Sequence, residues 1–121
     1  VIVNNDNWLV KKKGTFFMPQ EERKEIIAAF RAVDEVVLTK HPANPTDMSV
    51  CHVLEKLRPS IFANGGDRDV QDAKSKSSSL KPEYELCDRL GIKMVFNVGR
   101  GGKVQSSSDL VKRAKGLEKR R

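Results

Sequence analysis

The sequence has few cysteines and no long apolar segment. Its two cysteines, Cys51 and Cys87, lie within apolar helical patterns, so we expect buried side chains in a reducing, cytoplasmic compartment rather than a disulfide framework. Neither has a second Cys or His at ligand spacing, which disfavours a metal site. No apolar run approaches the roughly 20 residues that span a bilayer, and no signal peptide is recognisable, so we expect no membrane partner.

Positive charge is in excess, but most of the excess lies near the C-terminus. The formal net charge is +7. Residues 112–121 hold six basic side chains and one acidic one, a net +5, which leaves +2 for the rest of the chain. This distribution argues against nucleic acid as the main partner. With 38% hydrophobic and 32% charged residues, we predict one soluble domain, residues 1–116, followed by a basic tail, residues 117–121.

Short apolar runs alternate with amphipathic patterns along the chain. Strands are predicted at 1–3, 36–38, 61–63 and 92–98. Helices are predicted after Pro19, after a cap at Thr46 and Asp47, from Pro82 to Leu90, and from Ser106 onward. Residues 4–7 are expected to form a turn, the lysines at 11–13 a phosphate site or a solvated loop, and residues 69–81 a polar loop. The alternation predicts an α/β fold with a doubly wound, Rossmann-like parallel sheet.

The stretch 60–68 is the part around which the chain is organised, because an apolar run stops there at a glycine turn. Ligands of open α/β sheets bind just beyond the carboxyl ends of such strands. Two adjacent glycines allow backbone N–H groups to approach a phosphate. An ordinary strand-to-loop turn is the alternative. The turn consists of Asn64, Gly65, Gly66, Asp67 and Arg68.

Two more polar segments follow predicted strands and are expected on the same face of the sheet. The first holds Asp6 and the lysines at 11–13, which could bind phosphate or form a solvated loop. The second ends at the serines 106–108, where a helix N-terminus with free N–H groups favours an anion, and Lys103 lies just upstream. The alternative is that Ser106 or Ser107 only caps that helix.

Four segments in order resemble the cytidylyltransferase-like family of nucleotidyltransferases, which includes glycerol-phosphate cytidylyltransferases and sugar-phosphate adenylyltransferases. They are VIVNND at 1–6, the ERKEII and VDEV runs at 22–27 and 33–36, FANGGDR at 62–68, and QSSS at 105–108. The resemblance covers residues 1–114. It implies transfer of a nucleotidyl group from CTP or ATP to a small phosphorylated polyol or sugar, with release of pyrophosphate and with Mg²⁺ as cofactor.

The resemblance also implies roles for individual residues and a tendency to form a homodimer. A non-catalytic relative that binds nucleotide or nucleic acid is the alternative function. By motif, Lys12 or Lys13 would neutralise phosphate charge together with Ser107, and Asp6 and Arg23 would bind the second substrate. The nucleotide would be bound by Asn64, Gly65, Gly66, Asp67, Arg68, Lys103, Ser106, Ser107 and Ser108.

The chain departs from the family at its signature, a glycine turn that ends in His-x-Gly-His. His41 and His52 stand in other contexts, and the matching pattern begins at the family's second strand. The first strand is the centre of the family's sheet, so its neighbours would lack a pairing partner. We therefore expect a preceding segment or a separate N-terminal fragment to supply it, and we expect residues 1–121 alone to fold poorly and to show no measurable transfer.

Overall fold

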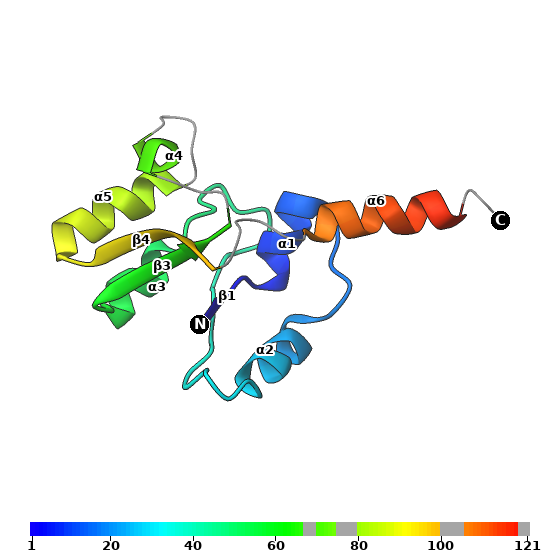
Figure 1. Cartoon of the computed structure of the whole chain (residues 1–121), viewed down its shortest axis with the longest axis horizontal. Coiled ribbons are helices and arrows are strands. Elements are labelled where there is room, and N and C mark those ends of the chain that lie inside the picture. Colours follow the sequence, from blue (N-terminus) through cyan, green and yellow to red (C-terminus); the bar gives the residue numbers. More distant parts are fainter. Residues whose placement is uncertain (67–69, 75–79, 100–105, 119–121) are drawn as a thin grey trace.

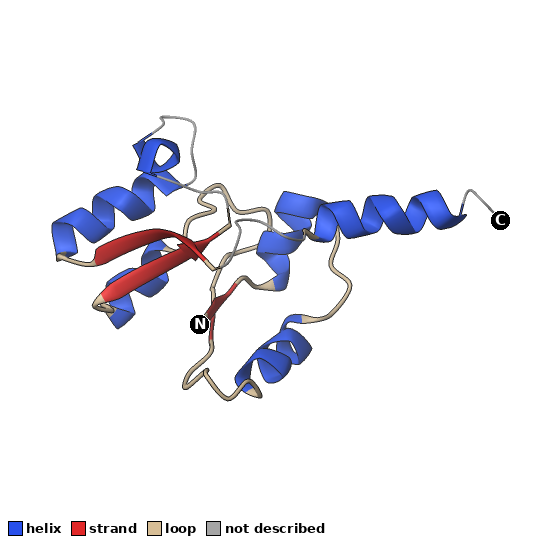
Figure 2. Ribbon diagram, viewed as in Figure 1, coloured by secondary structure: helices blue, strands red, loops and turns tan. Residues whose placement is uncertain are grey.

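The computed structural model of the chain is a mixed α/β protein (Figures 1 and 2). It describes residues 1–66, 70–74, 80–99 and 106–118. The strands of these residues are β1 (Ile2–Val3), β2 (Val37–Leu38), β3 (Ile61–Gly65) and β4 (Lys93–Val98). The helices are α1 (Asp6–Lys13), α2 (Gln20–Ala28), α3 (Cys51–Leu57), α4 (Val70–Lys74), α5 (Leu80–Leu90) and α6 (Ser107–Glu118). All four predicted strands are therefore confirmed.

The strands of the described residues pair in parallel, as the sequence predicts. β1 pairs with β2, with Ile2 opposite Val37, and β3 pairs with β4, with Ile61 opposite Lys93. The register of the second pair shifts between Ala63 and Gly65. Each pair is a separate two-stranded sheet, so the single doubly wound sheet remains a prediction. In Figure 1, α3 and α5 flank the β3–β4 pair, and α6 begins beside α1 and extends away from the body.

α1 occupies residues that the sequence predicts as turn and loop. Asn5 caps it, because the Asn5 Oδ1 accepts a hydrogen bond from the Trp8 backbone N–H at 3.0 Å. Asp6 lies in the first turn and three lysines in the last, an arrangement that the helix dipole favours. Gly14 ends the helix at φ +84° and donates its N–H to the Val10 carbonyl. The prediction of a loop was wrong because the polar run caps a helix.

Two other predicted boundaries were also wrong. α4 forms within the predicted loop 69–81, and α5 begins at Leu80 rather than at Pro82. Thr46 and Asp47 do not cap α3, which begins five residues after Thr46, at Cys51. The Asp47 carboxylate instead accepts the Ser49 N–H at 2.9 Å, while the Val50 N–H at the start of α3 donates to the Glu83 carboxylate of α5 at 2.9 Å. A cap from a distant helix leaves no local sequence signal.

The core lies where α3, α5 and the start of β4 meet. Leu54, Leu86, Cys87 and Ile92 form its buried cluster, and Ile2 of β1 and Phe62 of β3 pack against it. One residue from each strand pair therefore contacts the same core. Both cysteines are free thiols, with Cys87 buried and Cys51 half-buried. None of the described helices combines the length and the apolar character that a membrane span would need.

Candidate functional site

Lys13, the last residue of α1, meets the first turn of α6 although 94 residues separate them in sequence. Its Nζ lies 2.8 Å from the Ser107 Oγ and 3.3 Å from the Ser108 Oγ. Ser106 has a different contact, because its hydroxyl accepts the Asp109 N–H at 3.1 Å and donates to the Asp109 carboxylate at 2.8 Å. Ser106 is thus the helix cap, which leaves Ser107 and Ser108 to contact the lysine.

This arrangement suits an anion. An ammonium group and two hydroxyls gather at the N-terminus of a 12-residue helix, where the helix dipole adds partial positive charge. Each serine hydroxyl accepts from Lys13 through its oxygen and keeps its own proton to donate. Lys13, Ser107 and Ser108 are all exposed, so a ligand can reach them from solvent. We call Lys13, Ser107 and Ser108 the lysine–serine cluster.

The other two lysines of α1 lie differently. The Lys11 Nζ donates to the Asn44 Oδ1 at 2.8 Å. Lys12 is exposed and makes no hydrogen bond or ion pair within the described residues. The sequence does not distinguish Lys12 from Lys13 as a phosphate ligand, whereas the geometry favours Lys13.

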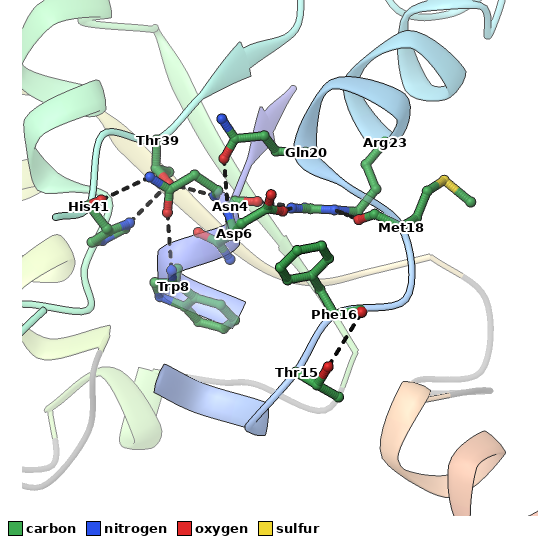
Figure 3. Close-up of polar contacts among 11 residues, drawn as sticks. Asn4, Asp6, Trp8, Thr15, Phe16, Met18, Gln20, Arg23, Thr39 and His41 are labelled. Atoms are coloured by element: carbon green, nitrogen blue, oxygen red, sulfur yellow. Dashed lines mark hydrogen bonds and ion pairs between the residues drawn. The ribbon is translucent and has the colours of Figure 1, made fainter. Parts of the chain in front are cut away.

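Asp6 and Arg23 contact each other at the end of β1. The Arg23 Nη2 lies 2.7 Å from the Asp6 Oδ1, and both side chains are largely covered, with 18% and 26% of their surface exposed. The same guanidinium donates to the Asn4 carbonyl at 2.5 Å and to the Met18 carbonyl at 2.9 Å (Figure 3). Arg23 thereby joins α2 to the turn between β1 and α1. The predicted contact of Asp6 and Arg23 with a substrate stays a prediction.

The predicted glycine turn begins at the end of β3. Gly65 is in close contact with β4, since a Cβ at this position would lie 3.3 Å from the Val98 carbonyl oxygen. Gly66 has φ +75°, a conformation that favours glycine. The Asn64 Nδ2 is buried and has no hydrogen-bond partner among the described residues, and the same holds for the Oδ1 of Asn4 after β1. Asp67, Arg68 and Lys103 lie outside the described residues, so their predicted roles stay predictions.

Thr39 and His41 form a buried network that sequence reasoning missed. The His41 Nδ1 lies 2.9 Å from the Thr39 Oγ1, and its Nε2 lies 2.9 Å from the Ser49 carbonyl. Thr39 also accepts the Asn5 backbone N–H at 2.9 Å, which ties the network to the start of α1 (Figure 3). The sequence carries no signal for this network, because the His41 ring contacts a threonine hydroxyl and a backbone carbonyl.

The predicted Mg²⁺ stays a prediction, because such an ion is usually held by substrate phosphates and only one or two protein carboxylates. Within the described ranges, no three His, Cys, Asp or Glu side chains gather as a metal site. The carboxylate nearest the end of β1, Asp6, already pairs with Arg23. The roles below are therefore derived without a metal.

Two cavities flank α3 and do not include the lysine–serine cluster. One, of about 380 Å³, lies between α3 and α5 and is lined by Cys51 and Leu86 among others. The second, of about 360 Å³, lies between α3 and β2 and is lined by Leu38 and His52 among others. The candidate site is thus an open surface at the ends of α1 and α6.

His52 gives the chain a specific acid sensitivity. Desolvation lowers the pKa of His52 below its usual value near 6.5, and His41 and Lys40 lower it further against an opposing effect of Asp47. Its Nε2 accepts the Lys40 N–H at 3.0 Å, which requires an unprotonated ring nitrogen. Because the unfolded chain binds this proton at a higher pH than the folded chain, the contribution of His52 to the free energy of unfolding should be constant above about pH 7 and should fall as pH drops below about 6.5.

Urea denaturation at several pH values measures this effect. His52→Gln, whose amide oxygen can still accept the Lys40 N–H, should show a smaller loss of stability between about pH 7 and pH 5.5 than the parent protein. Identical pH profiles for the two proteins would contradict a role of His52.

Comparison with curated proteins finds FAD synthases. The chain is 36% identical to the FAD synthase of Pyrococcus horikoshii over 89 residues, which are 71% of this chain and 57% of that protein. It is 35% identical to the Pyrococcus abyssi enzyme over 88 residues, 69% of this chain and 56% of that protein. It is 28% identical to the FAD synthase of Methanopyrus kandleri over 72 residues, which are 60% of this chain and 44% of that protein.

No protein-family model matches the chain, and no solved structure matches it significantly. The chain spans a little over half the length of the two Pyrococcus relatives. Over most of its own length the chain is therefore similar to the two Pyrococcus FAD synthases.

Proposed function

We propose that this chain carries the nucleotide-binding part of a nucleotidyltransferase that transfers AMP from ATP to FMN and so forms FAD. The observation that carries the proposal is the lysine–serine cluster, in which Lys13 contacts Ser107 and Ser108 at a helix N-terminus. The similarity to FAD synthases supports the choice of ATP and FMN. With ATP as the donor, the proposed activity is that of an adenylyltransferase within the cytidylyltransferase-like family.

The proposed reaction is a displacement at the α-phosphorus of ATP. A terminal phosphate oxygen of FMN attacks the α-phosphorus, a new P–O bond forms, and the bond to the bridging oxygen of the β-phosphate breaks. Pyrophosphate leaves with that electron pair. Negative charge gathers on the oxygens in line with the α-phosphorus, so positioning and charge neutralisation provide most of the catalysis.

Lys13, Ser107 and Ser108 are the residues that we assign to the nucleotide phosphates. Lys13 would neutralise charge on the leaving pyrophosphate, and the two hydroxyls would donate to its oxygens. Ser106 would act indirectly, because its hydroxyl caps α6.

FMN carries a phosphate at the end of a ribityl chain and is therefore a phosphorylated polyol that also bears a flavin ring. The sequence predicts a small phosphorylated polyol or sugar as acceptor, whereas the similarity to FAD synthases supports FMN. Transfer from CTP to a smaller polyol or sugar phosphate remains the alternative within the same chemistry.

We also propose that the two strand pairs are halves of one doubly wound sheet. Two features support this: Ile2 and Phe62 pack against one core cluster, and the Asn4 Oδ1 and Asn64 Nδ2 at the two strand ends are buried with no hydrogen-bond partner in the described part of the chain. A further strand between β1 and β3 would pair with the edge of β3 that no described strand occupies. Rapid exchange of the backbone amide hydrogens of β1 and β3 in the full-length protein would contradict the proposal.

Incubation of the full-length protein with ATP and FMN tests the function. Chromatography with fluorescence detection should reveal FAD, and a coupled assay should detect an equal amount of pyrophosphate. Parallel reactions pair CTP with FMN, and ATP or CTP with glycerol phosphate. Turnover only with a small polyol phosphate would reject FMN as acceptor. Tight binding of an oligonucleotide, with no pyrophosphate from any pair, would reject the enzymatic function altogether.

Ser106 and Ser107 form a matched pair that separates helix capping from phosphate binding. Ser107→Ala should weaken ATP binding by about 1–3 kcal/mol, because its hydroxyl would contact a charged phosphate. Ser106→Ala should instead lower the free energy of unfolding by about 1 kcal/mol through loss of the cap. Calorimetry with ATP and thermal unfolding measure both quantities. An unchanged ATP affinity in Ser107→Ala would contradict its assigned role.

A further inference from the structure

The loop between β2 and α3 holds α1 along most of its length. We call residues 39–49 the α1 cradle. Five hydrogen bonds join the cradle to α1 and its cap: Asn5 N–H to Thr39 Oγ1 at 2.9 Å, the Asn5 and Asn7 side-chain amides to the His41 carbonyl at 2.9 Å each, Trp8 Nε1 to the Met48 carbonyl at 2.9 Å, and Lys11 Nζ to Asn44 Oδ1 at 2.8 Å. The proposed reaction does not use any of them directly.

The His41 ring connects Thr39 and Ser49, the first and last residues of this cradle, by hydrogen bonds. Its Nε2 faces the Ser49 carbonyl, which can only accept, so Nε2 carries a proton. Its Nδ1 lies 2.9 Å from the Thr39 Oγ1, and the same oxygen accepts the Asn5 N–H. Thr39, His41 and Ser49 are 3%, 4% and 2% exposed. Water is therefore a poor substitute for these bonds.

The cradle contacts α1 from its cap at Asn5 to Lys11, and the lysine–serine cluster lies just beyond, at the last residue of the helix. α1 has eight residues and is therefore about 12 Å long at 1.5 Å per residue. Because the helix is rigid over this length, a tilt at its N-terminal cap displaces Lys13 at its other end. Phosphoryl chemistry is sensitive to such shifts, since a displacement of about 1 Å can cost about 100-fold in rate.

We propose that His41 is a positioning residue: by bracing the α1 cradle it fixes α1 and thereby holds the Lys13 ammonium at the hydroxyls of Ser107 and Ser108. The inference rests on the proposed contact between Lys13 and the nucleotide. His41 does not touch the nucleotide in this arrangement, and its effect passes through Thr39 and the cap of α1.

A double-mutant cycle with Lys13 tests the coupling in the full-length protein. Thr39→Val removes the hydroxyl while keeping the shape of the side chain, and Thr39→Ser restores it. His41→Leu removes both ring contacts, and His41→Gln can replace a donor and an acceptor. ATP affinity by calorimetry should fall about tenfold in Thr39→Val and His41→Leu, and less in Thr39→Ser and His41→Gln. In a Lys13→Ala background, Thr39→Val should change ATP affinity by less than about twofold.

An equal loss of affinity with and without Lys13 would overturn the proposal, because Thr39 and His41 would then act only on general stability. Hydrogen exchange provides a readout that needs no nucleotide: residues 8–13 should lose amide protection in Thr39→Val and keep it in Thr39→Ser. Should His41→Leu fail to fold, the threonine pair carries the test. An unchanged ATP affinity in Lys13→Ala would mean that Lys13 does not contact the nucleotide phosphates, and would reject that part of the proposed function. Unchanged hydrogen exchange of residues 8–13 in Thr39→Val would instead reject the positioning of α1.

Discussion

Replacement of Lys13 with alanine is expected to lower kcat/KM for FAD formation by about 100- to 1000-fold in the full-length protein. The Lys13 Nζ lies within hydrogen-bond distance of both Ser107 and Ser108, so its charge stands where we place the leaving phosphates. Alanine would leave the helix dipole and the hydroxyls but remove the only full positive charge that the described residues bring to this cluster. Steady-state rates with ATP and FMN measure the effect.

Lys12→Ala is the matched control, because Lys12 lies on the same helix and makes no polar contact within the described ranges. Its kcat/KM should stay within about threefold of the parent value, as expected for an exposed side chain. Lys13→Arg should recover part of the rate, since it keeps the charge with a different geometry. If Lys12→Ala and Lys13→Ala lost activity equally, the assignment of Lys13 would be wrong.

Leu54→Ala is expected to lower the free energy of unfolding by about 3 kcal/mol, within the range for leucine in a tightly packed core. Leu54 is fully buried at the centre of the core cluster, where it packs with Leu86, Cys87 and Ile92. The substitution removes transfer free energy and leaves a cavity that α3 and α5 can only partly close. Urea denaturation of the full-length protein provides the measurement.

Leu57→Ala tests whether the effect depends on burial rather than on the residue type. Leu57 lies in the same helix but is 42% exposed, so the loss should be below about 1 kcal/mol. Equal losses for Leu54→Ala and Leu57→Ala would mean that the packing of α3 differs from the one described.

Much of the fold can be predicted from local sequence patterns. The strands were predictable because each is a short apolar run between polar turns, and α2 because Pro19 and two glutamates mark its first turn. α1 was missed because its cap, Asn5, also belongs to a run of turn-forming residues. The start of α3 was misplaced because its first N–H is satisfied by Glu83, 33 residues further along the chain.

The candidate site was predictable in its parts but not in its assembly. The serines 106–108 and the lysines of α1 carry recognisable phosphate-binding chemistry, and the sequence predicts that they share one face. Which lysine reaches which serine depends on the length and tilt of α1, which tertiary contacts decide. His41 gave no signal of its role, because its ring bonds a backbone carbonyl and a threonine rather than charged partners.

The hydrogen bond between Val50 and Glu83 makes the stability of one helix depend on another. α3 has seven residues, too few to persist alone in water, and its N-terminus has no cap from its own side chains. The carboxylate that completes its first turn belongs to α5, with which it also shares the core. We therefore expect α3 and α5 to open as one cooperative unit, with the amide hydrogens of both helices exchanging through a single common opening.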